Sequence, residues 1–264
     1  MNVLSRGFVR SLGLVLLAAS VVAVEDGGTL SAAVISWDAP QTISGDADVN
    51  TTGSLFCAYN FGPAGVGAST VNGVTFSAYE FPVWSSSQQT VAREHLSFAE
   101  TPGYLTSYNT LGSASAPYSN LSSAYQGLLG NAGSASPDQT ITATLSDLTN
   151  GQQYLVQWWV SNAANTISEF GLGLTTTTAS AGNSVTLDSN VGNTAGGLGQ
   201  YGIGTFTADG TSQDFTLDGP DVANLPMINA LQVRVVPEPT LGVAAALISV
   251  GLAGVAVRRR PSAT

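Results

Sequence analysis

The middle of the chain is divided into short apolar or alternating segments, each bounded by residues that favour turns. Seven such segments are residues 54–61 (SLFCAYNF), 74–81 (VTFSAYEF), 140–145 (TITATL), 153–160 (QYLVQWWV), 201–207, 212–217 and 230–235. Turn-forming pairs separate them, at Gly62-Pro63, Asn72-Gly73, Asn150-Gly151, Asp209-Gly210 and Gly219-Pro220. Many short strands with turns between them are typical of a sandwich. We therefore expect an all-β fold, a jelly-roll or Greek-key-like β-sandwich, over residues 34–235.

Two local patterns refine this expectation. Residues 119–129 place Leu121, Tyr125 and Leu128 at helical spacing, which predicts one short helix. Leu148 lies six residues before Tyr154 with a turn between them, as in the tyrosine corner of Greek-key sandwiches, where the phenol bonds back to the connecting loop. An ordinary turn before a strand is the alternative for that second pattern.

The charge of the chain is strongly one-sided. The chain has no lysine, and residues 24–238 hold all seventeen acidic residues against two arginines, Arg93 and Arg234, for a formal charge of −15. Such a surface repels phosphate, which argues against nucleic-acid binding. Cys57 and His95 are the single residues of their types, so an internal disulfide and cysteine-rich zinc or iron–sulfur sites are excluded.

The first residues have the pattern of a secretory signal peptide. Arg6 and Arg10 precede an apolar run over residues 12–22, and Val21 and Ala23 fit the small-residue cleavage pattern. We expect residues 1–23 to be removed, with a mature start at Val24 or, by a second candidate site, at Val34. An anchor helix is the alternative, although eleven apolar residues are short for a membrane span.

The last residues predict a membrane helix. Residues 241–257 carry no charge and, at about 1.5 Å per residue, span roughly 25 Å, enough for a thin bilayer. Arg258, Arg259 and Arg260 follow directly and should hold that end in the cytoplasm.

Val236, Pro237, Glu238 and Pro239 precede this helix. The order of Pro-Glu-Pro, apolar helix and arginine cluster resembles the PEP-CTERM sorting signal of bacterial envelope proteins. The resemblance covers residues 236–264, and it implies processing by the membrane protease exosortase. It implies an inner-membrane-anchored precursor that moves to the cell surface, the outer membrane or the extracellular matrix.

Three constellations could carry chemistry. His95 could act as a general base with Glu94 or Glu100 nearby, but neighbours on an extended strand point to opposite faces, and a surface strand with a local ion pair is the simpler interpretation. Cys57 lies inside a strand, as a small buried hydrophobe would.

The second constellation is Asp46, Asp48 and Asn50, which have the alternating spacing of a calcium loop. The glycine and glutamate of an EF-hand are missing, so a weak Ca²⁺ site in a sandwich loop is the remaining metal hypothesis. Turn chemistry is the alternative, because Asp and Asn bond to nearby backbone. No other cofactor is expected.

The third constellation is aromatic, and it comprises Trp37, Trp84, Trp158 and Trp159. Adjacent Trp158 and Trp159 face opposite sides of a strand, so at most one lies in the core between sheets. The other is covered by a loop, packed on a second layer, or exposed for stacking on sugars.

These patterns favour an exported, non-enzymatic protein with a structural or adhesive role, within or near exopolysaccharide. The expected partners are signal peptidase, exosortase and, for the mature protein, polysaccharide. A carbohydrate-binding module is the alternative, and a secreted glycoside hydrolase-like enzyme with paired carboxylates is the third.

The signal-peptide assignment predicts the N-terminus of the exported protein. Because the arginine-flanked apolar run ends at Ala23, Edman sequencing should begin at Val24 or Val34. Recovery of Met1 on surface-located protein would reject the assignment.

Overall fold

A computed structural model describes residues 33–83, 88–100, 103–135, 139–165, 175–219 and 225–237. The predicted signal peptide and the predicted membrane helix both lie outside these residues. Within the described ranges, no helix has the length and apolar character needed to cross a membrane.

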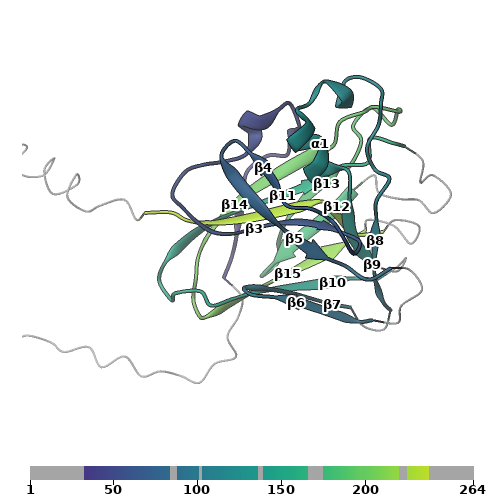
Figure 1. The fold of residues 1–264 in the computed structure, drawn as a ribbon. Helices are drawn as coiled ribbons and strands as arrows, with labels where there is room; N and C mark the ends of the chain where they lie inside the picture. The colour runs from purple at the N-terminus through teal and green to yellow at the C-terminus, as the bar shows by residue number, and fades with distance from the viewer. Residues whose placement is uncertain are drawn as a thin grey trace, which may run out of the picture.

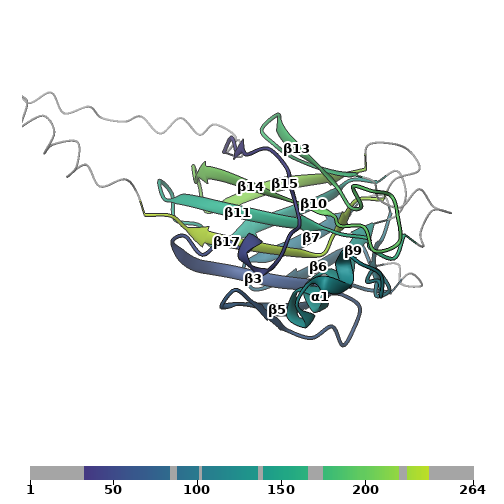
Figure 2. The same ribbon diagram turned by 90° about the horizontal axis from the view of Figure 1, so that it is seen from above.

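Two large β-sheets form the body of the described chain (Figures 1 and 2). The first sheet has the order β1 (Ser36–Trp37), β14 (Gln200–Thr207), β11 (Gln153–Val160), β17 (Ala230–Val235), β3 (Ser54–Gly62), β5 (Val74–Glu80), β4 (Ser69–Val71), with β2 (Gln41–Thr42) also paired to β14. The second has the order β13 (Asn183–Asp188), β12 (Thr175–Ser180), β15 (Ser212–Asp218), β10 (Ile141–Ser146), β7 (Leu96–Glu100), β6 (Thr90–Arg93).

Smaller elements lie at one end of this body. A third sheet has the order β16 (Met227–Ile228), β9 (Ala132–Ala135), β8 (Leu105–Tyr108), and the one described α-helix is α1 (Ser123–Leu129). Two 3₁₀ turns, η1 (Asp46–Asp48) and η2 (Tyr118–Asn120), precede α1 in the chain. The all-β class with one short helix is therefore confirmed, and all seven predicted segments are strands within one or two residues of their predicted bounds.

The main core lies between the two large sheets and follows the period-2 pattern of their strands. On β10, Ile141, Ala143 and Leu145 are buried while the residues between them are only half-buried. On β11, Trp158 faces this core and meets the ring of Phe215 on β15, with ring centroids 5.2 Å apart. The side chains on the other face of each inner strand therefore lie outside this core.

A second core covers the opposite face of the first sheet. Trp159 points to that face, where it packs with Tyr125 of α1 and with Phe76 of β5 at a centroid distance of 5.5 Å. Its indole N–H donates to the Tyr125 hydroxyl at 2.9 Å. Trp158 and Trp159 are therefore both buried, and of the outcomes considered for the second indole, packing on a second layer is the one observed.

The helix begins later than its spacing predicted. Ser122 caps α1 by accepting a hydrogen bond from the Tyr125 N–H at 3.1 Å, and this fixes the start at Ser123. Residues 118–120 form the 3₁₀ turn η2, so the predicted start at residue 119 was wrong. Ser122, a residue type that favours the N-cap position, indicates the correct start of the helix.

Tyr154 lies in the main core near the start of β11. Its phenol oxygen accepts a hydrogen bond from the Thr149 backbone N–H at 2.9 Å, and its ring stacks on Phe206 with centroids 5.6 Å apart. Leu148, at the other end of the same turn, is also buried. The turn between β10 and β11 is thus attached to the core through a side chain.

We predict that Tyr154→Phe lowers the free energy of unfolding by about 1 kcal/mol, because the partly buried Thr149 N–H loses its acceptor. Chemical denaturation would measure the loss. Tyr201→Phe is the control, since the half-buried Tyr201 hydroxyl bonds to no described residue. Equal midpoints for the wild type and Tyr154→Phe would show that the contact does not stabilise the turn.

Candidate functional site

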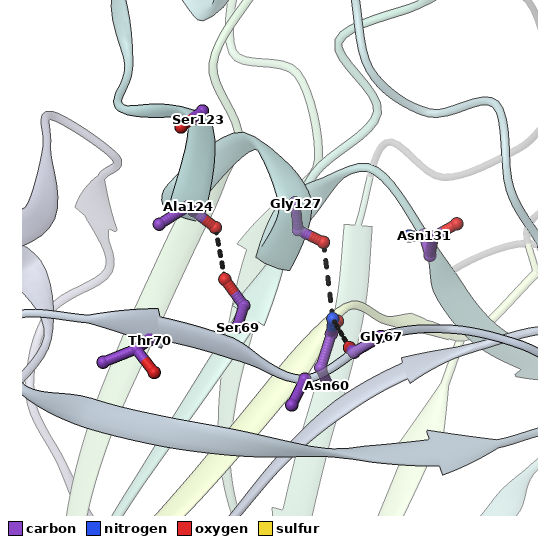
Figure 3. Close-up of a pocket in the computed structure, with 9 residues that line it drawn as sticks. Asn60, Gly67, Ser69, Thr70, Ser123, Ala124, Gly127 and Asn131 are labelled. Carbon is purple, nitrogen blue, oxygen red and sulfur yellow. Dashed lines mark hydrogen bonds between the residues drawn. The ribbon is translucent and has the colours of Figure 1, made fainter.

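A groove of about 550 Å³ lies between helix α1 and the edge strand β4 (Figure 3). Its walls are Asn60 of β3, residues 67–70, Asn131, and three residues of α1, namely Ser123, Ala124 and Gly127. This volume falls within the ~300–1,000 Å³ that is typical of small-molecule sites. The groove is open to solvent on one side.

Two side chains join the walls of the groove at its floor. Ser69 Oγ donates to the Ala124 carbonyl at 2.6 Å. The Asn60 amide nitrogen donates to the carbonyls of Gly67 and Gly127, at 2.9 and 3.4 Å (Figure 3). Asn60 is only 2% exposed, so these contacts are shielded from water and hold β3, β4 and α1 at a fixed separation.

Two glycines line opposite walls of the groove, and close packing does not require glycine at either position. A Cβ at Gly67 would meet nothing within 4 Å, and one at Gly127 would meet only Ser69 Oγ at 3.8 Å. By contrast, a Cβ at Gly62 would lie 2.8 Å from Asn131. A glycine inside a helix is less stable than alanine by about 0.8–1.0 kcal/mol, so Gly127 lowers the stability of α1 while leaving the groove wide.

The lining of the groove is polar but uncharged. It offers the Ser123 hydroxyl, the Asn131 amide and the exposed backbone beside the glycines, whereas the Thr70 hydroxyl is hydrogen-bonded to Thr75 Oγ1 at 3.0 Å. These groups can donate and accept hydrogen bonds but cannot act as a general acid or base near neutral pH. The arrangement suits binding of a neutral polar ligand.

Val236 follows β17 and is hydrogen-bonded to residues 152 and 153 at the start of β11. The Val236 N–H donates to the Gln153 carbonyl at 3.0 Å, and Gln152 Nε2 donates to the Val236 carbonyl at 2.9 Å. Val236 is half-buried and Pro237 is exposed. Val236 is therefore attached to the β11 end of the sheet, and Pro237 is the first exposed residue after β17.

A buried arginine fixes the loop next to this exit. The Arg234 guanidinium is 7% exposed and donates to the carbonyls of Thr51, Thr52 and Gly53 at 3.1, 2.8 and 2.8 Å. Burial lowers the pKa of Arg234 from its ordinary value. Gly53 has a φ of +76°, and a Cβ there would lie 2.1 Å from the Val235 carbonyl oxygen.

Two glutamines extend this polar row along the same face. Gln232 Nε2 donates to Asn50 O at 2.9 Å and to Gln157 Oε1 at 2.7 Å. Gln157 Nε2 donates in turn to the Asp48 carbonyl at 2.7 Å. Residues 48–53 are thus attached to three polar side chains on β11 and β17.

The remaining sorting residues, Glu238 and Pro239, lie outside the described residues. The same holds for Arg258, Arg259 and Arg260, and for Trp84.

The three calcium-spaced residues engage separate partners. Asp46 accepts from Ser122 Oγ at 2.6 Å. Asp48 accepts from backbone N–H groups of residues 44 and 45, at 2.7 and 2.9 Å, and from the Tyr125 hydroxyl at 3.2 Å. Asn50 accepts from the N–H of residue 52 at 2.7 Å. These are turn and capping contacts, and the described ranges hold no group of three His, Cys, Asp or Glu suited to a metal.

His95 lies in a hairpin turn rather than on a strand. β6 ends at Arg93 and β7 begins at Leu96, so Glu94 and His95 form the turn, and Glu94 has a φ of +42°. The expectation of an extended strand there was wrong. His95 Nδ1 lies 3.0 Å from Asp147 Oδ2, so its partner comes from the β10–β11 turn, 52 residues along the chain, and the contact is not a local one. Glu100 lies at the other end of β7.

Cys57 is buried in β3, and burial raises its thiol pKa to about 12. A thiol is a nucleophile only as thiolate, so Cys57 is unreactive near neutral pH. Trp37, on β1, is half-buried.

The groove residues were absent from the sequence interpretation, although two signals were present. Asn60 is a polar residue inside the apolar segment SLFCAYNF, and Gly127 is a glycine inside a helical segment. These two signals could not be connected from the sequence, because the contact between β3 and α1 depends on packing between distant segments.

Comparisons with known proteins show no family for this chain. No family model and no curated protein matches the chain. Among solved structures, the chain is similar to the enzymatically active domain of tailspike protein 4 from bacteriophage CBA120, with a TM-score of 0.26 and 10% identity over 54% of this chain. The match covers 19% of the tailspike chain. A likeness at this TM-score carries no argument about fold or function.

The contacts of Arg234 generate a stability prediction. Arg234→Met should lower the free energy of unfolding by about 3 kcal/mol, because three partly buried carbonyls lose charged donors. Arg93→Met is the matched control, because the exposed Arg93 on β6 donates to one described carbonyl, that of Ala78, and its loss should lower the free energy of unfolding by about 1 kcal/mol or less. Similar losses in both variants would show that the buried position of Arg234 has no special role.

Proposed function

We propose that this chain is an exported protein with a structural or adhesive role at the bacterial surface or in an extracellular polysaccharide matrix. Its jelly-roll or Greek-key-like sandwich is displayed outside the cell, and its C-terminal segment acts as a PEP-CTERM-type sorting signal. The observation that carries this proposal is that Val236 is hydrogen-bonded to the β11 end of the sheet, while Pro237, the first residue of the Pro-Glu-Pro segment, is exposed.

The Pro-Glu-Pro segment therefore follows the last described strand rather than forming part of it. Hydrogen bonds attach both the N–H and the carbonyl of Val236 to the β11 end of the sheet, and the next residue, Pro237, is exposed. A proline cannot donate a backbone hydrogen bond and disfavours helix in the residue before it, so the following segment suits entry into a protease. Cleavage there would leave every described strand intact.

The proposed role of the folded domain is non-catalytic. Its large aromatic side chains fill the two cores, as Trp158 and Trp159 show on the two faces of β11. The net negative charge of residues 24–238 keeps such a domain soluble and disfavours nucleic acid as a partner. A carbohydrate-binding module is the second candidate, and the uncharged groove between α1 and β4 favours it.

The sorting proposal predicts a shortened mature protein. Mass spectrometry of surface-located protein from wild-type cells should find a C-terminus near Thr240, because exosortase would remove the helix and the arginines. In cells lacking exosortase, and for a Pro237→Ala, Glu238→Ala, Pro239→Ala triple variant, the intact precursor should accumulate in the inner membrane.

The design separates processing from folding. Gln152→Ala is the matched control, because it removes one contact at Val236 but keeps the Pro-Glu-Pro segment, and it should be processed normally. An intact C-terminus at Thr264 on surface-located wild-type protein would contradict the proposal, and the tail would then be a membrane anchor.

A further inference from the structure

We infer that the groove between α1 and β4 binds a segment of an uncharged polysaccharide. This inference rests on the proposed function for its setting outside the cell, and it adds a site and a ligand class. The ligand is defined by its chemistry, a neutral chain rich in hydroxyl groups.

The first support is the pair of glycines that widen the groove. Gly67 and Gly127 lie on opposite walls, and neither needs to be glycine for backbone conformation or for space. Glycine inside a helix lowers stability, so its presence at residue 127 needs another reason. Close approach of a ligand to the backbone is such a reason.

The second support is a buried acceptor at the floor of the groove. Figure 3 shows the Asn60 amide pointing from β3 toward α1, between Gly67 and Gly127. Its nitrogen donates to both of their carbonyls, whereas its oxygen Oδ1 bonds to no described residue. A buried acceptor without a donor is unfavourable. A ligand hydroxyl would supply the donor after a small movement of the groove walls, because Oδ1 itself is buried in the structure.

The lining selects the class of ligand. No charged side chain lines the groove, so an acidic or basic polymer gains no ion pair there. The small side chains form no deep apolar pocket, which disfavours peptides that anchor through large apolar residues. Hydroxyl, amide and backbone groups remain, and these hydrogen-bond to sugar hydroxyls.

The groove also lies at the end of the domain away from the membrane tether. Asn229, just before β17, donates to the carbonyls of Leu129 and Asn131 at 2.8 Å each, beside the groove. Val236 lies at the other end of β17, roughly 24 Å from Asn229 for seven residue steps at ~3.4 Å each. In both Figures 1 and 2 the yellow end of β17 lies at the left edge of the domain, and α1 lies to its right.

Binding of defined oligosaccharides tests the inference. The full chain, purified in mild detergent, would be titrated calorimetrically with neutral hexasaccharides of glucose, mannose and galactose, an acidic hexamer of galacturonate, and a random peptide pool. We expect at least one neutral hexasaccharide to bind. Gly127→Leu and Gly67→Leu, from the two walls, should each weaken that binding tenfold or more.

Two further measurements keep the result interpretable. The thermal midpoint of Gly127→Leu should equal or exceed that of the wild type, because leucine favours helix, so lost binding cannot be assigned to misfolding. Ser184→Leu adds the same side chain at an exposed site on the distant strand β13 and should bind as the wild type does.

Several outcomes would overturn the inference. These are no binding of any neutral hexasaccharide, equal binding by the groove variants, and preference for the acidic hexamer or the peptides. Because this assay does not depend on tail cleavage, failure here with normal processing would remove the groove site and leave the sorting proposal standing.

Discussion

The described fold depends on the pairing of β17 with both of its neighbours. This C-terminal strand lies between β11 and β3, and antiparallel partners flank it over its whole length. Its inward residues Leu231 and Val233 fill the main core, while Gln232 and Arg234 bond to the loop over residues 48–53. The first sheet is therefore complete only when β17, the last described strand, has paired with both neighbours. The residues that stabilise this sheet thus lie directly before Pro237, where the chain leaves it.

The same strand relates the two functional proposals in space. At one end, Asn229 holds the chain that leaves α1, next to the groove. At the other end, Val236 is the last bonded residue before the Pro-Glu-Pro segment. A chain attached to the envelope at one end of β17 would present the groove at the other. The outer face of the sheet is polar near the exit and apolar beneath α1, because Trp159 and Phe76 need cover that the helix provides.

The local sequence pattern predicted where seven strands lie, but it gave no information on which strands pair with one another. The alternation in residues 140–145 and the aromatic run in residues 153–160 were sufficient to identify β10 and β11, because each strand meets a core directly. The strands β6 to β9 and β12 to β13 carry weaker patterns, and the parallel pairing of β3 with β5 is a long-range choice. The local sequence pattern gave no indication that Arg234 is buried, since its backbone partners are more than 180 residues away. The groove was missed for a similar reason, as its walls come from residues 60–70 and residues 123–131, which are more than 50 residues apart in the chain.

Hydrogen–deuterium exchange of the full chain, read by peptide mass spectrometry, tests most directly whether the fold depends on β17. The account predicts that amides of residues 231–235 exchange only through global unfolding, as slowly as those of residues 154–159 on β11, because both strands have partners on each side. Faster exchange in β17 than in the β11–β14 pair would show that the C-terminal strand opens independently, and would contradict the account.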